Sequence, residues 1–146
     1  MTKILIYTFR TFPYLEELKK VFPDVVVFGK LKEDIDSFCQ KILNERPEFI
    51  LGVAKSEYGY SVFEPKAVNK FGSDFKVLQE ENEELKLFIP NLADTSFMIS
   101  SIITTTFCNY SMFKIKSFLD SQKLDVKFAF VHICEKDVKE LVNVIK

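Results

Sequence analysis

The sequence predicts an α/β fold, a three-layer α/β/α sandwich with a mostly parallel central sheet. Short apolar runs alternate with segments of helical apolar spacing over the first third of the chain, which gives a β-α-β-α-β order. A further strand followed by a helix is predicted at the carboxyl end. Because 146 residues fit one core and no linker or repeat interrupts them, we expect a single domain over residues 1–146.

The opening elements carry the pattern most clearly. Residues 4–8, 25–28 and 49–53 are short apolar, β-branched or aromatic runs, as in buried strands. Pro13 opens a helical pattern between the first two runs, and Pro47 ends another before the third. Because strands and helices alternate in this way, we expect parallel strands with helices on both faces of the sheet.

The middle of the chain predicts shorter elements. Residues 58–63 and 67–71 are expected to be extended, and residues 74–78 and 85–89 flank an acidic, turn-like segment that predicts a hairpin. The last part predicts, in order, a strand, a helix, a strand and a final amphipathic helix at residues 98–103, 108–119, 126–133 and 135–145.

Composition and charge exclude several classes of function. A net charge of −1 and a pI near 5.9 give no electrostatic footprint for nucleic acid or an anionic membrane. No stretch approaches the roughly 20 apolar residues of a membrane span. The first residues show neither an extended h-region nor a small-residue cleavage site, so we expect no signal peptide. The three cysteines do not form a disulfide framework, so we expect a reducing cytoplasm.

His132 is the only histidine, so any histidine-dependent proton transfer must use it. It lies near the carboxyl end of its predicted strand, and Cys108 opens the helix that follows the preceding strand. Ligands of open α/β sheets bind outside the carboxyl ends of the strands, so both residues fall on the rim where a site is expected. A helix N-terminus lowers a thiol pKa, which predicts a reactive thiolate at Cys108.

Structural explanations stay open for the same residues. Cys108 can be a small apolar filler, and His132 can be a satisfied structural residue. Cys134 shares a strand face with His132, but the chain has no further histidine and no paired cysteine spacing. We therefore expect no metal and no cofactor. Cys39 lies on a helix's apolar stripe and is assigned to the core.

Five segments together resemble the pyroglutamyl peptidases, or pyrrolidone carboxyl peptidases, a family of cytosolic cysteine peptidases. Residues 108–112 match the Cys-Asn-x-x-Met segment of the nucleophile, and residues 130–133 resemble the strand end with the catalytic histidine. Residues 64–69 match the Glu-x-x-Ala-Val-Asn segment of the catalytic acid. Residues 3–12 resemble the opening strand and loop, and residues 27–29 align with a further segment.

The resemblance implies a phosphorylase/hydrolase-like fold and a Cys-His-Glu triad of Cys108, His132 and Glu64. Such a triad cleaves an N-terminal pyroglutamyl amide, or a similar small acyl amide, of a small peptide. The aromatic rings that enclose the lactam in the family correspond to Phe9, Phe12 and Phe107, whose alternative explanation is ordinary core packing. Family members self-associate, so the resemblance leaves a homo-oligomer open.

The chain departs from the family pattern around the site. It is shorter than family members, and Thr8 directly precedes Phe9, so the glycine of the family's opening loop is missing. Residues 102–104 read Ile-Ile-Thr where the family has Ser-Ala-Gly. Asp74 falls where the family has an arginine that neutralises the oxyanion. Lys70 and Lys76 are the candidate replacements for that arginine.

Two functional hypotheses follow from the retained and the changed positions. The leading one is an enzyme, a short and divergent cysteine hydrolase of the pyroglutamyl peptidase type. The alternative is a catalytically weak or inactive descendant that binds a small ligand or a protein partner. A third explanation, an unrelated α/β domain with accidental matches, is kept as a minor alternative.

Overall fold

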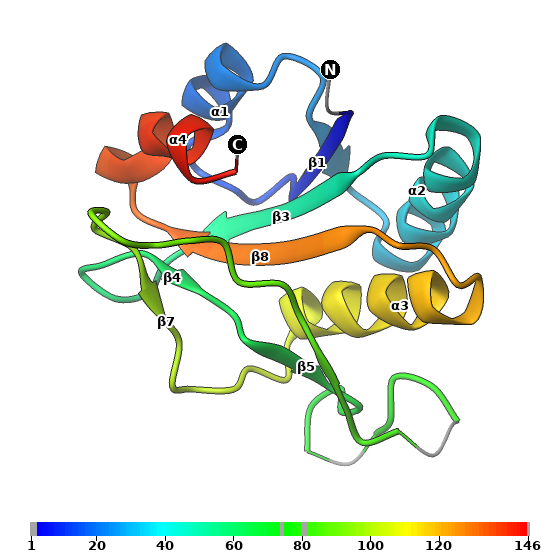
Figure 1. Ribbon diagram of the computed structural model, residues 1–146. Coiled ribbons are helices and arrows are strands. Elements are labelled where there is room, and N and C mark those ends of the chain that lie inside the picture. Colours follow the sequence, from blue (N-terminus) through cyan, green and yellow to red (C-terminus); the bar gives the residue numbers. More distant parts are fainter. Residues whose placement is uncertain (1–2, 74, 80–81, 146) are drawn as a thin grey trace.

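The computed structural model describes residues 3–73, 75–79 and 82–145. Within them, a six-stranded sheet has the order β2-β1-β3-β8-β4-β7. These strands are β2 (Val26–Phe28), β1 (Ile4–Phe9), β3 (Phe49–Lys55), β8 (Lys127–Ile133), β4 (Val62–Phe63) and β7 (Met98–Ile99). The first four are mutually parallel, and β4 runs antiparallel to β8. The predicted α/β class with a mostly parallel sheet is confirmed (Figure 1).

Helices cover both faces of this sheet (Figure 1). Side chains of α2 (Leu31–Glu45) and α3 (Phe107–Ser121) share one buried cluster with Leu5 and Tyr7 of β1. The alternate residue Ile6 faces the other cluster, with α1 (Leu15–Val21), the 3-10 helix η1 (Glu135–Glu140) and α4 (Leu141–Val144). None of the described helices is both long and apolar enough to span a membrane.

The two central strands explain why the apolar runs of the sequence are continuous. All residues of β3 except Lys55 are buried, and in β8 only Lys127 and His132 are not. A strand with packed helices above and below it has no solvated face, so it shows no alternation of apolar and polar residues. His132 is therefore a polar interruption of a core strand.

The predicted pairing of residues 74–78 with 85–89 is wrong. Instead, β5 (Lys66–Val68) pairs antiparallel with β6 (Glu84–Lys86) in a separate two-stranded sheet. The side chain of Asn69 holds the intervening loop, because its Oδ1 accepts the N–H groups of Val77 and Leu78 at 2.9 and 3.0 Å. These amides are thus used by a side chain and are not available for a strand ladder.

Two late elements are shorter than predicted. The strand expected at residues 98–103 is limited to β7, because the hydroxyl of Ser100 accepts the Ile102 N–H and donates to the Ile102 carbonyl, which forms a turn. The helix expected at residues 135–145 is divided into η1 and α4. The remaining extended segment leads from β7 to the start of α3.

Gly52 of β3 provides a test of this packing. A Cβ atom built on it would lie 2.4 Å from Cδ2 of Phe130 and 2.6 Å from Cζ of Tyr7, on the two neighbouring strands. We expect Gly52→Ala to lower the free energy of unfolding by about 1–3 kcal/mol, measured by urea denaturation. Gly59→Ala is the control, because no atom lies within 4 Å of its Cβ position. Equal stability of the two variants would contradict this account.

Candidate active site

Glu64 and His132 form a hydrogen-bonded pair at the junction of β4 and β8. His132 lies opposite Val62 in the antiparallel ladder, and the backbone N–H of Glu64 donates to the Phe130 carbonyl at 2.9 Å. This register brings Glu64 Oε2 to 3.0 Å from His132 Nδ1. The Glu64 residue is only 4% exposed, whereas the His132 side chain retains 17% exposure. The imidazole therefore connects a buried carboxylate to a more open space.

Cys108 reaches the same region from α3, which packs on the face of the sheet where Phe130 lies; His132, two residues further along β8, shares that face. It is the second residue of α3, whose N-cap is Thr106, and it is 5% exposed. The first hydrogen bond within α3 runs from the Tyr110 N–H to the Thr106 carbonyl. The N–H groups before Tyr110 therefore have no partner within the helix, and they form the positive end of its dipole.

One cavity of about 610 Å³ joins these groups. All six residues that the sequence suggested for the site line it, namely Phe9, Phe12, Glu64, Phe107, Cys108 and His132. The remaining lining comes from the end of β3 and the loop after it, from the segment between β7 and α3, and from Thr11 in the loop after β1. The cavity thus lies where several strand ends meet the start of a helix.

The three phenylalanines differ in exposure. Phe9 and Phe12 are 5% exposed, whereas Phe107 is 41% exposed. The rings of Phe9 and Phe107 meet edge to face, with their centroids 4.8 Å apart. Phe107 therefore rests on a fixed ring with one side open to the cavity, and Phe9 also packs in the core against Tyr7 and Phe28.

The electrostatics of Cys108 correct the expectation of a preformed thiolate. The pKa of the Cys108 thiol is raised to about 12, mainly by burial, with a smaller contribution from the negative charge of Glu64. Hydrogen bonds from the Thr106 side chain and from the backbone of Cys108 itself lower the pKa, but by less. Loss of water around the sulfur outweighs these hydrogen bonds, so the pKa lies well above neutral pH.

Asn109 ties the helix of Cys108 to the segment that follows Glu64. Its Oδ1 accepts the Val68 N–H at 2.9 Å, and its Nδ2 donates to the carbonyls of Val68 and Lys70 at 2.8 and 2.9 Å. In the sequence, Asn109 stands only as the second residue of the Cys-Asn-x-x-Met match, with no role assigned to it. The sequence signal that could have identified it is an asparagine within a helical pattern of apolar residues, because asparagine has an unfavourable helix propensity.

A second buried connection supports Cys108 from the sheet. The Ser111 hydroxyl donates to the Cys108 carbonyl at 2.7 Å, so the Tyr7 hydroxyl, 2.8 Å away, donates to Ser111. Burial raises the pKa of Tyr7 well above its usual value, which keeps this hydroxyl a donor. The first turn of α3 is therefore fixed to β1 as well as to β5.

The suggested replacements for an oxyanion cation do not line the cavity. Lys70 and Lys76 are absent from its lining, and Lys76 lies 3.6 Å from Glu83 in an ion pair. Asp74 lies outside the described residues. Lys55, at the end of β3, is the one lysine or arginine among the described lining residues. In the described part of the chain, no three His, Cys, Asp or Glu side chains are grouped to hold a metal ion.

The protonated state of Cys108 predicts slow alkylation of the free protein. We expect the rate with iodoacetamide to rise with pH throughout pH 6–10 without a plateau, because the thiolate fraction keeps increasing below a pKa of about 12. Mass spectrometric mapping separates Cys108 from half-buried Cys134, which serves as the internal reference. A rate plateau for Cys108 near neutral pH would contradict the assignment.

Comparison with known proteins shows the fold. No protein-family model matches the chain, and no curated protein matches it. Pyroglutamyl peptidase I from Bacillus amyloliquefaciens superposes with a TM-score of 0.81 at 11% identity, covering 99% of this chain and 94% of that one. Pyrrolidone carboxyl peptidase from Thermococcus litoralis superposes with a TM-score of 0.73 at 20% identity, covering 90% and 76%.

The E192D mutant of pyrrolidone carboxyl peptidase from Pyrococcus furiosus gives a TM-score of 0.71 at 16% identity, covering 89% of this chain and 79% of that one. These structures share the three-layer architecture over nearly the whole chain, although few residues are identical. The chain therefore has the pyroglutamyl peptidase fold.

Proposed function

We propose that the chain is a cysteine hydrolase of the pyroglutamyl peptidase type, which cleaves an N-terminal pyroglutamyl amide or a similar small acyl amide. The observation that carries the proposal is the 3.0 Å hydrogen bond between Glu64 and His132, together with the one cavity that both residues line with Cys108. In this proposal Cys108 is the nucleophile, His132 the general base and acid, and Glu64 the group that orients the imidazole.

The hydrogen bond to Glu64 assigns the two nitrogens of His132. An ionised carboxylate only accepts hydrogen bonds, so Nδ1 carries the hydrogen and donates it, and Nε2 is left with a free lone pair. Nε2 takes the thiol proton as the Cys108 sulfur bonds to the acyl carbon. It then gives that proton to the amine as the C–N bond breaks, and water hydrolyses the resulting thioester.

The raised pKa of Cys108 determines when the thiol proton moves. A thiol with a pKa of about 12 does not ionise before the substrate arrives, so proton transfer and attack belong to one step. The imidazolium formed in that step lies against the Glu64 carboxylate, which stabilises its positive charge. His132 thus acts as a base during the reaction.

The cavity provides surroundings suited to a small acyl group. Phe9, Phe12 and Phe107 supply apolar surface for a lactam ring. The N–H groups at the start of α3 that have no partner within the helix are the candidates for stabilising the oxyanion, because they carry the positive end of the helix dipole beside the nucleophile. All three cysteines are free, which supports a reducing, cytoplasmic setting.

A second candidate function is a module that binds the same small ligand without turnover. The observation in its favour is the burial of Cys108, which raises the pKa of its thiol to about 12 and so holds the thiol in its unreactive, protonated form. This candidate keeps the cavity and the aromatic rings but assigns no chemistry to the thiol. Turnover measurements separate it from the hydrolase.

Removal of the sulfur tests the nucleophile. We expect the purified protein to hydrolyse a fluorogenic pyroglutamyl amide, and Cys108→Ala to reduce the rate to that of buffer alone, because no other side chain forms the thioester. Cys134→Ala is the matched control, since Cys134 does not line the cavity. The same rate in the parent and in Cys108→Ala would reject the hydrolase and leave the binding module.

Replacement of the carboxylate tests the role of Glu64. We expect Glu64→Gln to lower kcat by about 10²–10⁴-fold, because an amide fills the same space but does not stabilise the imidazolium. Glu83→Gln, on an exposed carboxylate, should retain the parent rate. An unchanged kcat in a folded Glu64→Gln protein would remove Glu64 from the mechanism.

A further inference from the structure

Exposed apolar side chains are concentrated around the mouth of the cavity. Among the described residues ten large apolar side chains are exposed. Seven belong to the loop after β3, to β7 and its following turn, or to the start of α3; they are Tyr58, Tyr60, Met98, Ile99, Ile102, Ile103 and Phe107. Exposed apolar groups that gather in one place mark a binding surface.

Four of these side chains line the cavity itself. Tyr58, Ile102, Ile103 and Phe107 do so together with Cys108 and His132. Ile102 and Ile103 are 57% and 47% exposed, although they directly precede the polar segment that leads to the nucleophile helix. Their apolar surface is therefore available to a molecule that occupies the cavity.

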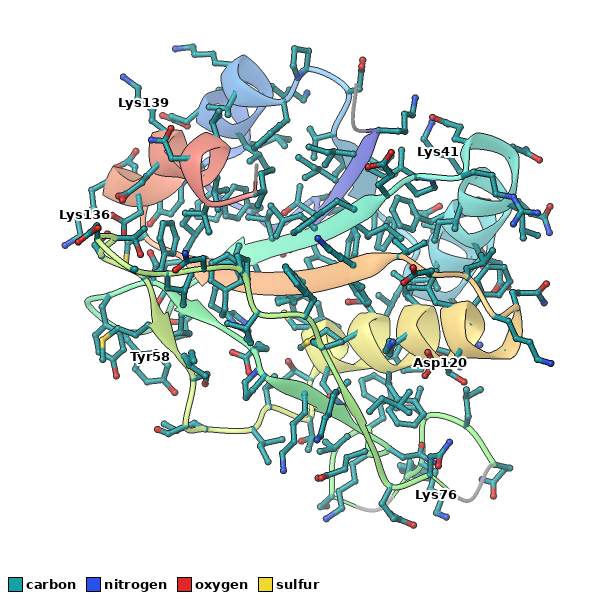
Figure 2. All side chains as sticks on the ribbon, viewed as in Figure 1. Lys41, Tyr58, Lys76, Asp120, Lys136 and Lys139 are labelled. Atoms are coloured by element: carbon teal, nitrogen blue, oxygen red, sulfur yellow. The ribbon has the colours of Figure 1, made fainter. Side chains whose placement is uncertain are left out.

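The two sides of this mouth are held by polar side chains in their own loops. The hydroxyl of Ser56 accepts the Tyr58 N–H at 3.0 Å and donates to the Tyr60 carbonyl at 2.7 Å. Opposite, the hydroxyl of Ser100 binds both the N–H and the carbonyl of Ile102. Figure 2 shows Tyr58 at the end of the molecule where β7 lies. The apolar side chains therefore belong to structured turns.

The cavity is larger than an acyl ring needs. A volume of about 610 Å³ lies within the range of sites for whole drug-sized ligands, which is roughly 300–1,000 Å³. The buried rings of Phe9 and Phe12 account for a lactam at the inner end. Space lined by Tyr58, Ile102 and Ile103 remains for the group on the other side of the scissile bond.

We infer that Tyr58, Ile102 and Ile103 form a subsite for an apolar side chain on the residue that follows the pyroglutamyl group. This inference rests on the proposed function and names its substrate class, pyroglutamyl peptides with an apolar second residue. The charged lining residues of the mouth, Lys55 and Glu57, have opposite signs, so net charge does not decide the preference. The preference is decided by the free energy gained when an apolar side chain of the substrate is buried.

The test compares pyroglutamyl-leucine amide with pyroglutamyl-asparagine amide, whose second side chains are similar in shape but differ in polarity. Hydrolysis releases a primary amine, which is quantified by its fluorescent derivative. We expect kcat/KM to favour leucine by at least about tenfold, because the apolar side chain is buried against the isoleucines. Equal kcat/KM values for the two compounds would overturn the inference while the proposed function stands.

Variants assign the preference to these residues. In a double variant with Ile102→Ser and Ile103→Ser the leucine-to-asparagine ratio should fall to about one, and the exposed positions should leave folding intact. Val142→Ser, on an exposed apolar residue of α4, should keep the ratio. A double variant that keeps the parent ratio would remove Ile102 and Ile103 from the site.

Binding measurements separate failure of the inference from failure of the proposed function. If neither amide is hydrolysed, both are titrated into the Cys108→Ala protein by calorimetry. Tighter binding of the leucine amide, lost in the double variant, supports the subsite and rejects the hydrolase. No binding of either amide rejects both. A dimer that the double variant converts to a monomer would show that a second copy covers these residues, which overturns the inference.

Discussion

The hydrogen bond between Glu64 and His132 is the constraint on which the candidate site depends. A carboxylate that is 4% exposed is costly to bury unless it is paired. Its partner comes from a different strand, 68 residues away in sequence, so the pair exists only while β4 lies antiparallel to β8. The antiparallel pairing of β4 with β8, beside four mutually parallel strands, is what brings the Glu64 carboxylate to the His132 imidazole.

The helix that carries Cys108 is fixed to this pair by buried polar contacts. Asn109 binds the backbone that follows Glu64, and Ser111 connects the Cys108 carbonyl to Tyr7. Tyr7 in turn occupies space that exists because Gly52 has no side chain. Hydrogen bonds in such a low-dielectric interior are directional and strong, so they set the position of the sulfur as well as stabilise the fold.

Burial has opposite effects on the two parts of the site. It strengthens the interaction of Glu64 with the imidazole, but it holds Cys108 in its thiol form. In the proposed mechanism this thiol is unreactive in the free protein and attacks only when a substrate places an acyl carbon beside it. The exposed apolar side chains at the mouth are the part of the site that, in the proposed function, meets the substrate first.

The sequence by itself determined the fold class and the identity of the candidate residues. Continuous apolar runs such as residues 49–53 indicate strands buried on both faces. Apolar residues at helical spacing indicate helices, so the parallel sheet was predictable. Family-like motifs pointed to Cys108, His132 and Glu64. The strand predicted at residues 74–78 is wrong over its described residues because the side chain of Asn69 takes the amides of Val77 and Leu78, and such a polar contact leaves no periodic signal.

Only the tertiary structure decided the state of the site. The thiol pKa depends on how much water surrounds the sulfur, and helix position alone gave the wrong direction. The 3.0 Å contact depends on strand register, which local pattern does not encode. Exposure of Ile102 and Ile103 likewise follows from the turn at Ser100, where an apolar run leaves the sheet instead of continuing it. These properties arise from long-range packing, which local residue patterns do not specify.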